Sequence, residues 1–384
     1  MTVLLAVIFL AFIGLGLPDT VIGSIWPVIQ KETSSSVYGA GIITLIVQCG
    51  TVLSSLFASR LVQKFSTRIV TFTSILLTSF ALILYASSSN IIFLFFAAVP
   101  LGLGAGCVDA ALNGYVANHF KSNVMNFLHG FWGIGAFSGP FIMSMMIHNN
   151  ISWRTGFIII SVILLIIAVF VLSSKKYWLK EDYIVNNKKH ISSKNILKEP
   201  LVKPTLISFS FFSYIELTTG LWISSYLVYS FEVNPAQAAL ITAFYYGSIT
   251  VGRIVTGIFS NNFQNYQLIR AGEIIVILGC LLMMIDSLYI KTAGVIITGL
   301  GSSPIYPAML HNTPKIFGRE KSLTIMGMQM AVTYTGGALA PLLFGFLAGK
   351  TTFLILPFFI LFGAVIMLLS SEYLNYRIKA CNFR

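Results

Sequence analysis

Charged residues are scarce in this sequence, at 9% of its 384 residues, while 56% of the residues are hydrophobic. A soluble domain carries roughly 25% charged residues, and a single soluble core stops growing near about 250–300 residues. A water-soluble fold is therefore excluded, and a lipid bilayer has to solvate the apolar surface. Only helices or a closed barrel satisfy their backbone groups in lipid. The apolar runs are continuous over about 20 residues rather than alternating, which predicts helices.

Cysteine is also rare, and the motifs of several catalytic classes are missing. The four cysteines, Cys49, Cys107, Cys280 and Cys381, form no framework, so free thiols are expected. The sequence contains no metal-binding cluster, nucleotide-binding loop or nucleophile triad, so no cofactor, no metal and no enzymatic activity are expected. The glycine-rich run 102–106 lies inside an apolar helix, where small residues allow close packing.

The N-terminus lacks the basic segment of a signal peptide. Its apolar run is also longer than the usual ~7–15 residues, and it contains Asp19. We therefore predict a retained first helix.

Twelve apolar segments account for most of the chain and predict an all-α membrane protein. The predicted spans lie near 3–26, 38–59, 69–88, 91–117, 125–148, 153–173, 205–231, 236–260, 268–289, 293–315, 322–349 and 352–374. One long polar stretch, 174–203, contains eight lysines and separates two sets of six spans. It is predicted to be a cytoplasmic linker between an N-terminal half, 1–173, and a C-terminal half, 204–384.

The basic residues are distributed as this arrangement requires. All 24 Lys and Arg residues fall on the side of the termini and the linker, except Lys31, Arg154, Lys291 and Lys350. The positive-inside rule then predicts that both termini lie in the cytoplasm, with the spans in the cell membrane. The net charge of +12 is accordingly assigned to loops beside anionic lipid, and no nucleic-acid partner is expected.

The two halves share several small residues at matching positions. Gly102-Leu103-Gly104 in the fourth span matches Gly299-Leu300-Gly301 in the tenth. A glycine and a proline recur at the same offset in the fifth and eleventh spans, as Gly135 and Pro140 and as Gly336 and Pro341. Repeats of this kind place a solute site near the midplane, between the halves. A chance match among glycine-rich helices is the alternative.

Three acidic residues lie deep in the predicted spans: Asp19 in the first, Asp109 in the fourth and Glu216 in the seventh. At 1.5 Å per residue, Glu216 is about 16 Å from the cytoplasmic end of its span. An ionised side chain there costs at least about 2.5–3.5 kcal/mol, and no Lys or Arg is predicted at comparable depth. Burial away from cations favours a protonated carboxyl group, so these groups are predicted to load and release protons. The alternative is an acid that stays protonated and only hydrogen-bonds neighbouring helices.

Polar residues cluster around Asp109. Asn113 lies four residues further on and shares its helix face. The fifth span returns His129 to about the same level, with Asn126 one turn nearer the cytoplasm. The aligned positions of Asp109 and His129 in the C-terminal half are Tyr306 and Met330. Helix packing therefore does not require the ionisable pair, although a structural role for His129 is the alternative.

A second polar group surrounds Glu216, since Thr218, Thr219 and Trp222 follow within two turns. A carboxylate, hydroxyl groups and a ring face suit a polyhydroxylated ligand such as a sugar. The predicted cavity is completed by further residues in mid-span: Gln48, Trp132, Tyr245, Tyr246, Gln329 and Tyr334. Membrane aromatics belong more often to an interfacial belt or to the packing, which is the alternative for each of them.

Four stretches resemble those of known carriers: Gly14-Leu15-Gly16-Leu17-Pro18-Asp19, Asp109-Ala110-Ala111-Leu112-Asn113, the run 126–136 that begins Asn126-Phe127-Leu128-His129, and Tyr214-x-Glu216 followed by Gly220-x-Trp222. With the two six-helix halves and the basic linker, the chain resembles the major facilitator superfamily, and more narrowly its fucose permease-like branch of sugar–proton symporters. The resemblance implies that Asp19 and Asp109 bind solute and carry protons. It implies further cavity residues in both halves, namely Asn113, Asn126, His129, Glu216 and Trp222.

The chain departs from the superfamily in the loop between the second and third spans. That loop usually reads Gly-x-x-x-Asp-Arg-x-Gly-Arg-Arg, but here Ser59, Gln63 and Ser66 replace its two glycines and its acid. The cytoplasmic gate that this acid helps to close must then be held in another way. In the fourth span, Asp109 stands where the sugar permease has Glu, and Gly114 where a proline often follows.

The favoured hypothesis is secondary transport of a sugar or similar small polar metabolite, by proton symport and alternating access. The alternative within transport is proton-antiport efflux of a drug, siderophore or metabolite, for which the same acids would serve. A receptor or scaffold would have no reason to keep three deep acids. A monomer is expected, and the sequence leaves open the solute, the direction and the choice between protons and sodium.

Overall fold

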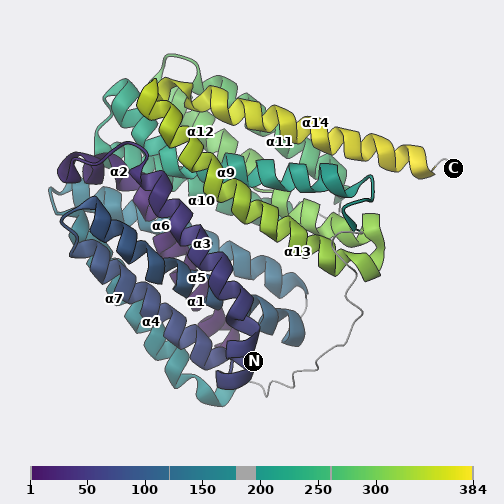
Figure 1. Cartoon of the computed structure of the whole chain (residues 1–384), viewed down its shortest axis with the longest axis horizontal. Coiled ribbons are helices and arrows are strands. Elements are labelled where there is room, and N and C mark those ends of the chain that lie inside the picture. The colour runs from purple at the N-terminus through teal and green to yellow at the C-terminus, as the bar shows by residue number, and fades with distance from the viewer. Residues whose placement is uncertain (1, 121, 179–195, 260–261, 383–384) are drawn as a thin grey trace. The chain divides into compact units, whose positions relative to one another are not determined.

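The computed structural model describes residues 2–120, 122–178, 196–259 and 262–382, which are helical almost throughout (Figure 1). Within them, twelve helical segments are long and apolar enough to cross a membrane, which confirms the predicted architecture. The helices are α1 (Thr2–Asp19), α2 (Val21–Thr33), α3 (Gly39–Phe65), α4 (Thr67–Ala86), α5 (Ile91–His119), α6 (Ser122–His148), α7 (Trp153–Ser173), α9 (Val202–Phe231), α10 (Pro235–Phe259), α11 (Asn265–Met283), α12 (Leu288–Ser302), α13 (Ile305–Lys350) and α14 (Leu356–Asn382). Two short 3₁₀ helices, Lys175–Tyr177 and Phe353–Ile355, follow α7 and precede α14.

The predicted spans differ from the observed ones mainly at their ends. The first span consists of α1 and α2 and runs to Thr33, and the last continues to Ala380. Helix α13 contains the end of the tenth span and the whole eleventh, because two helices meet at a kink at Gly318. Apolar content defines the middle of a span well, but amphipathic end turns extend a helix beyond its apolar run.

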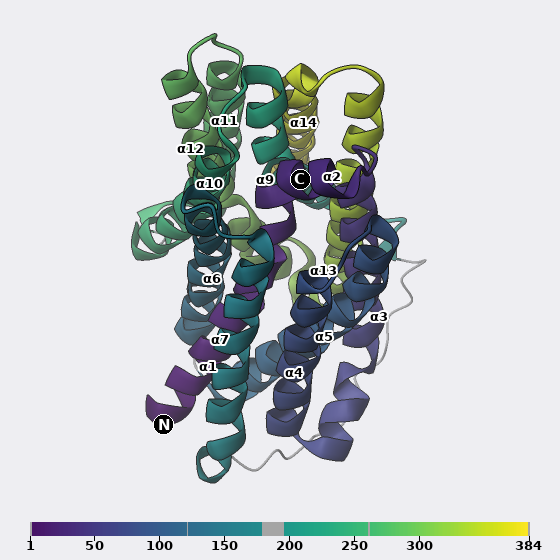
Figure 2. The same cartoon turned by 90° about the vertical axis from the view of Figure 1, so that its left-hand side faces the viewer.

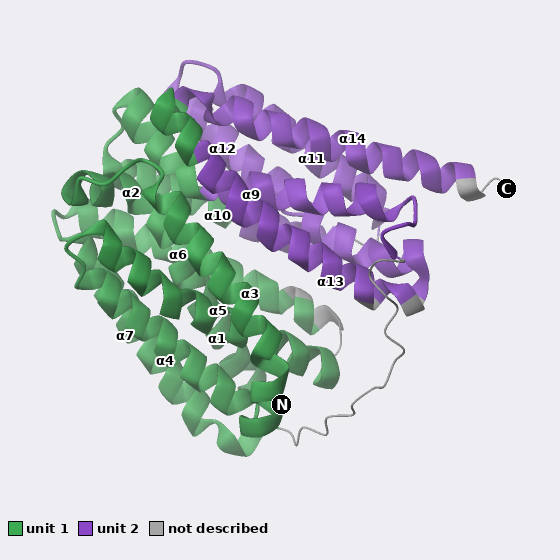
Figure 3. Cartoon of the chain, in the orientation of Figure 1, with its two compact units in different colours: residues 1–184, 221–247, 345–353 green, residues 185–220, 248–344, 354–384 purple. Residues whose placement is uncertain are grey.

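Contacts between helices divide the chain into two compact units (Figure 3). Unit 1 comprises Met1–Ile184, Leu221–Gly247 and Gly345–Phe353, and unit 2 comprises Val185–Gly220, Ser248–Phe344 and Leu354–Arg384. The end of α9, the start of α10 and the end of α13 therefore belong to unit 1. The division into an N-terminal half, a linker and a C-terminal half stays a prediction, and most of the linker, including Lys180, Lys188, Lys189 and Lys194, lies outside the described residues.

Glycines at the shared positions allow close helix packing in each unit. In unit 1, α4 and α5 lie side by side (Figure 2), and a Cβ at Gly104 of α5 would lie 2.4 Å from Thr78 Oγ1 of α4. In unit 2, the matching Gly301 of α12 faces α11, where a Cβ would lie 2.7 Å from the backbone nitrogen of Val276. The repeated glycines thus serve equivalent contacts between successive helices.

The second pair of matching glycines behaves in the same way. A Cβ at Gly135 of α6 would lie 2.1 Å from the carbonyl oxygen of Ile13 in α1. A Cβ at Gly336 of α13 would lie 2.5 Å from the carbonyl oxygen of Ser210 in α9. Equivalent helix pairs, first with fifth and seventh with eleventh, therefore approach through the matched glycines. This agreement argues against a chance match between the halves.

The turn between α3 and α4 places a serine in a conformation that usually requires glycine. Ser66 has φ 76° and ψ 153°, a region that is essentially restricted to glycine and costs other residues on the order of 1–3 kcal/mol. This is one of the positions where the superfamily pattern has glycine. Nearby, Arg68 Nη1 donates to the carbonyl oxygen of Leu172 at 2.8 Å, so a basic residue of this loop caps the last turn of α7.

Replacing Ser66 by glycine is expected to stabilise the protein by about 1–3 kcal/mol, because glycine adopts this conformation without a Cβ clash. The measurement is thermal unfolding of the purified protein in detergent. Ser87→Gly is the matched control. Ser87 lies at the other end of α4, where its φ of −87° is accessible to any residue, so glycine is not expected to stabilise the protein there. A Ser66→Gly protein no more stable than the native one would contradict the expected strain.

Candidate functional site

Asp19 is held at the end of α1 by a tryptophan of α6. Trp132 Nε1 donates a hydrogen bond to Asp19 Oδ2 at 3.0 Å. The two helices come close because Gly16 faces the backbone of α6, where a Cβ would lie 2.1 Å from the carbonyl oxygen of Trp132. Asp19 is exposed, although Pro18 and Thr20 on either side of it are buried. The packing of α1 against α6 therefore buries the neighbours of Asp19 but leaves Asp19 itself accessible.

The first span is interrupted directly after this carboxylate. Helix α1 ends at Asp19 and α2 begins at Val21, with Thr20 between them at ψ −4°. The Thr20 hydroxyl donates to the carbonyl oxygen of Ala136 in α6 at 2.8 Å. An interruption leaves backbone N–H and C=O groups without intrahelical partners, and transporter sites near the midplane are often formed by such discontinuous helices. The interruption therefore marks Asp19 as part of a candidate site.

Asp109 lies in the same unit and is half-buried in α5. Asn113 Nδ2 donates to Asp109 Oδ1 at 2.8 Å, which confirms that these two residues share a helix face. Among the described residues, neither Asp19 nor Asp109 forms an ion pair.

Three further predicted residues belong to unit 1 near these helices. His129 of α6 meets the ring of Phe12 in α1 edge-on, with ring centroids 6.0 Å apart. Gln48 of α3 is half-buried, and its Oε1 is buried without a hydrogen-bond partner within the described chain. Such an unsatisfied acceptor calls for a partner that the protein itself does not supply. Asn126 lies in α6, but its side chain is outside the described residues.

The prediction that Glu216 has no cation at its depth is wrong. Arg253 Nη2 of α10 lies 3.3 Å from Glu216 Oε1 of α9, and the two side chains are only 14% and 13% exposed. The charge count assigns Arg253 to the loop side although it lies within the predicted span 236–260, and α10, which ends at Phe259, keeps this residue inside. Glu216 is therefore a paired acid in unit 2. An arginine several residues before the end of an apolar run was the signal that could have revealed the pair.

The other predicted residues of unit 2 make contacts between helices or within α13. Gln329 is fully buried, and its Nε2 donates to Thr313 Oγ1 at 2.9 Å. Tyr334 is half-buried in the same helix. The Tyr306 hydroxyl donates to the sulfur of Met330 at 3.3 Å, so the two positions aligned with Asp109 and His129 touch each other. The C-terminal repeat thus fills the equivalent place with an uncharged pair.

Trp222, Tyr245 and Tyr246 belong to unit 1 and are almost completely buried. The Trp222 ring lies 5.9 Å from that of Phe353 and covers Gly345, where a Cβ would lie 2.8 Å from its Cζ2. The rings of Tyr245 and Tyr246 are 5.1 Å apart and nearly perpendicular. In this conformation the three aromatics pack helices together, and a role in solute binding stays a prediction.

Additional contacts inside unit 1 join segments that are predicted to belong to different halves. Ser144 Oγ of α6 donates to the carbonyl oxygen of Ala236 at 2.7 Å. The Tyr229 hydroxyl of α9 donates to Gln30 Oε1 of α2 at 2.9 Å. All four residues lie where odd-numbered spans end or even-numbered spans begin, which is the side opposite the chain termini. We call the two hydrogen bonds the outer contacts.

Twelve apolar spans with acids and amides in their middle define a multi-pass membrane transporter. The chain belongs to the Major Facilitator Superfamily, whose profile matches residues 4–287 and 205–377. This assignment confirms the coarser part of the resemblance, whereas membership of the fucose permease-like branch stays a prediction. The two solved structures that share the fold are transporters, and transporters are not enzymes.

Two curated relatives span most of the chain. The sequence is 24% identical over 375 residues to Bypass of stop codon protein 6 of Saccharomyces cerevisiae, covering 88% of this chain and 75% of that protein. It is 22% identical over 357 residues to the glucose/mannose transporter GlcP of Bacillus subtilis, covering 90% and 88%. Both alignments extend over both predicted halves.

Two solved structures share the fold. A mutant of the nucleoside transporter NupG superposes with a TM-score of 0.78 at 11% identity, covering 96% of this chain and 98% of that one. A bacterial homologue of the human lysosomal transporter Spinster, in an inward-facing and occupied conformation, superposes with a TM-score of 0.72 at 12% identity, covering 98% and 95%. At these identities the likeness establishes the fold alone.

Proposed function

We propose that the protein is a proton-coupled symporter of a sugar or similar small polar metabolite. The observation that carries the proposal is the pair of acids in unit 1, Asp19 and Asp109, neither of which forms an ion pair within the described chain. A proton on either carboxylate lowers the cost of carrying its charge in the bilayer. The similarity to a glucose/mannose transporter supports a sugar as the solute.

We assign a different role to each of the two acids on the basis of its hydrogen-bond partner. Asp109, whose Oδ1 is bonded to Asn113, is assigned the transported proton. Asp19 keeps one oxygen bonded to Trp132, so its other oxygen is assigned to accept a hydrogen bond from a solute hydroxyl. The unpartnered amide oxygen of Gln48 offers a second acceptor. Carboxylate and amide acceptors together suit a solute rich in hydroxyl groups.

The outer contacts support alternating access. They join segments of the two predicted halves by two hydrogen bonds, Ser144 with Ala236 and Tyr229 with Gln30. If the termini are cytoplasmic, as the basic loops predict, these contacts close the outer side of the carrier. Such isolated hydrogen bonds contribute only about 0.5–1.5 kcal/mol each, so solute binding can offset their loss when the halves rock apart.

Solute uptake by proteoliposomes tests the proposal. Vesicles with an alkaline interior are placed in acidic buffer with labelled hexoses, pentoses or nucleosides. Uptake above the level of protein-free vesicles is expected for at least one hexose, and a protonophore is expected to abolish the accumulation. Accumulation driven by a sodium gradient at equal pH would contradict proton coupling. Uptake that requires an acidic interior instead would establish antiport.

A further inference from the structure

A fourth acid, Glu273, is buried inside unit 2 and was not predicted to be deep. It is 0% exposed and lies about 12 Å along α11 from the start of that helix. Its Oε2 lies 2.7 Å from Ser371 Oγ of α14, and its Oε1 is buried without a hydrogen-bond partner in the described chain. A buried carboxylate with one free oxygen is costly, because ionised groups need both charge compensation and hydrogen bonds.

The charged residues near Glu273 leave its charge uncompensated. The nearest ionic groups that act on it are Arg270 and Glu372, from α11 and α14. These two bind each other, with Arg270 Nε and Nη2 donating to the Glu372 carboxylate at 2.6 and 2.5 Å. Because this bidentate pair is neutral overall, it contributes little electrostatic field at Glu273. Within the part of the chain that the structure describes, Glu273 itself forms no ion pair.

Ser371 Oγ has two acceptor oxygens within hydrogen-bond distance, the Glu273 Oε2 atom at 2.7 Å and the carbonyl oxygen of Leu368 at 3.0 Å. A serine hydroxyl has one hydrogen, and a carbonyl oxygen only accepts. The hydroxyl donates to Glu273 Oε2, or to Leu368 when the carboxyl group is protonated and donates to Ser371 Oγ. Either arrangement leaves Glu273 Oε1 without a partner in the described chain, and a neutral carboxyl group lowers the cost of burying it.

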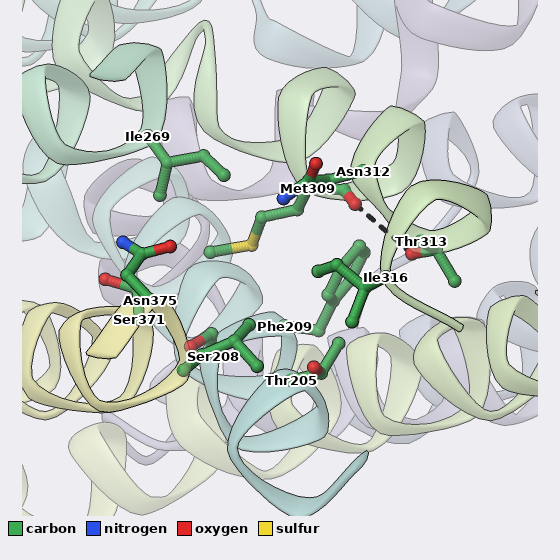
Figure 4. Close-up of a pocket in the computed structure, with 11 residues that line it drawn as sticks. Thr205, Ser208, Phe209, Ile269, Met309, Asn312, Thr313, Ile316, Ser371 and Asn375 are labelled. Atoms are coloured by element: carbon green, nitrogen blue, oxygen red, sulfur yellow. Dashed lines mark hydrogen bonds between the residues drawn. The ribbon is translucent and has the colours of Figure 1, made fainter. Parts of the chain in front are cut away.

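A small cavity with several polar residues in its lining adjoins this pair. It has a volume of about 20 Å³, enough for about one water molecule. Its polar lining comes from three helices, and Figure 4 shows these residues around it: Thr205, Ser208, Asn312, Thr313, Ser371 and Asn375. Ser208 is 2% exposed, and its Oγ has no hydrogen-bond partner within the described chain. Ser371 both lines the cavity and contacts Glu273, so a water molecule there would reach the acid through one hydroxyl.

The equivalent helix pair in unit 1 is joined without an acid. The third and sixth spans, α4 and α7, are linked by the hydroxyls of Ser79 and Ser161, whose oxygens are 2.7 Å apart. The ninth and twelfth spans, α11 and α14, use Ser371 and Glu273 instead. Two serines are sufficient to hold such a pair of helices. Packing alone therefore does not explain why a carboxyl group is buried in unit 2.

We infer that Glu273 is a second proton-binding site, separate from the proposed site in unit 1. In this assignment the carboxyl group is protonated and hydrogen-bonded to Ser371 Oγ. Release breaks the carboxyl O–H bond: the proton passes to Ser371 Oγ, which gives its own hydrogen to water in the cavity, and the resulting hydronium ion leaves to bulk solvent. Binding reverses these steps, and no other reactant is consumed. The inference goes beyond the proposed function and does not depend on any solute.

Infrared spectroscopy of the full-length protein in liposomes, without solute, tests the site. The native spectrum at neutral pH is expected to contain the C=O stretching band of a buried carboxylic acid that Glu273→Gln lacks. Ser371→Ala is expected to shift this band to higher frequency, because a hydrogen bond to the carboxyl group is lost. Asp286→Asn is the matched control, since the Asp286 side chain is 96% exposed and its loss should leave the band unchanged.

Thermal unfolding provides a second readout. Glutamine mimics the protonated acid in size and hydrogen bonding, so Glu273→Gln is expected to fold. The native protein is expected to lose stability as the pH rises from acidic values through neutral, because the unfolded chain releases the Glu273 proton before the folded protein does, and Glu273→Gln to lose less. Identical infrared bands in native and Glu273→Gln protein would overturn the inference. Loss of the band on adding sodium at constant pH would also overturn it, by identifying a cation site.

Discussion

Asp109→Asn is expected to abolish solute accumulation driven by a pH gradient while leaving solute exchange across the membrane intact. Asparagine keeps the size of the side chain and its contact with Asn113, but it cannot release or bind a proton at neutral pH. The substituted carrier behaves as if permanently protonated, so it can reorient with solute on either side. Coupled accumulation should fall to the level of an uncoupled carrier, and counterflow of labelled against unlabelled solute should continue.

Asp109→Glu is the matched comparison for this experiment. It restores a carboxyl group at the position where the sugar permease branch has glutamate, so gradient-driven uptake is expected to be retained. Accumulation that is unchanged in Asp109→Asn would move the transported proton to Asp19, the other acid in the proposed site of unit 1, which also forms no ion pair in the described chain. Loss of both accumulation and counterflow would assign Asp109 to solute binding instead.

Glu216→Gln is expected to destabilise the folded protein by about 3–5 kcal/mol, because it removes the carboxylate that faces the Arg253 guanidinium inside a span. The double substitution Glu216→Gln with Arg253→Gln removes both charges and is expected to recover most of this loss. Thermal unfolding in detergent measures the two variants. The coupling energy of the double-mutant cycle then reports the ion pair itself.

The Arg270–Glu372 pair is the control for this prediction. Its bidentate geometry is better than that of Glu216 with Arg253, but its side chains are 43% and 37% exposed. Exposed pairs contribute about 0–1 kcal/mol, so Glu372→Gln is expected to cost much less than Glu216→Gln. Equal losses in the two variants would mean that the Glu216–Arg253 pair is as well hydrated as a surface pair.

The parts of the fold that depend on local pattern were predictable from the sequence. Apolar run length located all twelve spans, because the bilayer sets a minimum length for each helix. The bond between Asp109 and Asn113 followed from their spacing on one helix. The matched glycines predicted equivalent close contacts, since only a residue without a Cβ lets two backbones approach so closely.

Contacts between distant helices were not predictable in the same way. Trp132 and Asp19 lie far apart in the sequence, and their hydrogen bond depends on how α6 is rotated against α1. Glu216 and Arg253 both lie within predicted spans, but their ion pair depends on how α9 and α10 are rotated against each other, which apolar content does not define. Glu273 was assigned to a helix end because the predicted ninth span began at 268, whereas α11 begins at Asn265.

The first span is interrupted at Thr20, directly beside the Asp19 carboxylate. Helix α1 ends with Asp19, and α2 carries Gln30, which meets Tyr229, and Glu32, whose Oε1 accepts from Arg154 Nη1 at 2.5 Å. A straight helix would transmit any tilt along its whole length. Because the first span is interrupted, α2 is expected to tilt independently while α1 stays packed on α6. Neutralising Asp19 is therefore expected to act at the junction between α1 and α2, the helix that carries the outer contact of Gln30 with Tyr229.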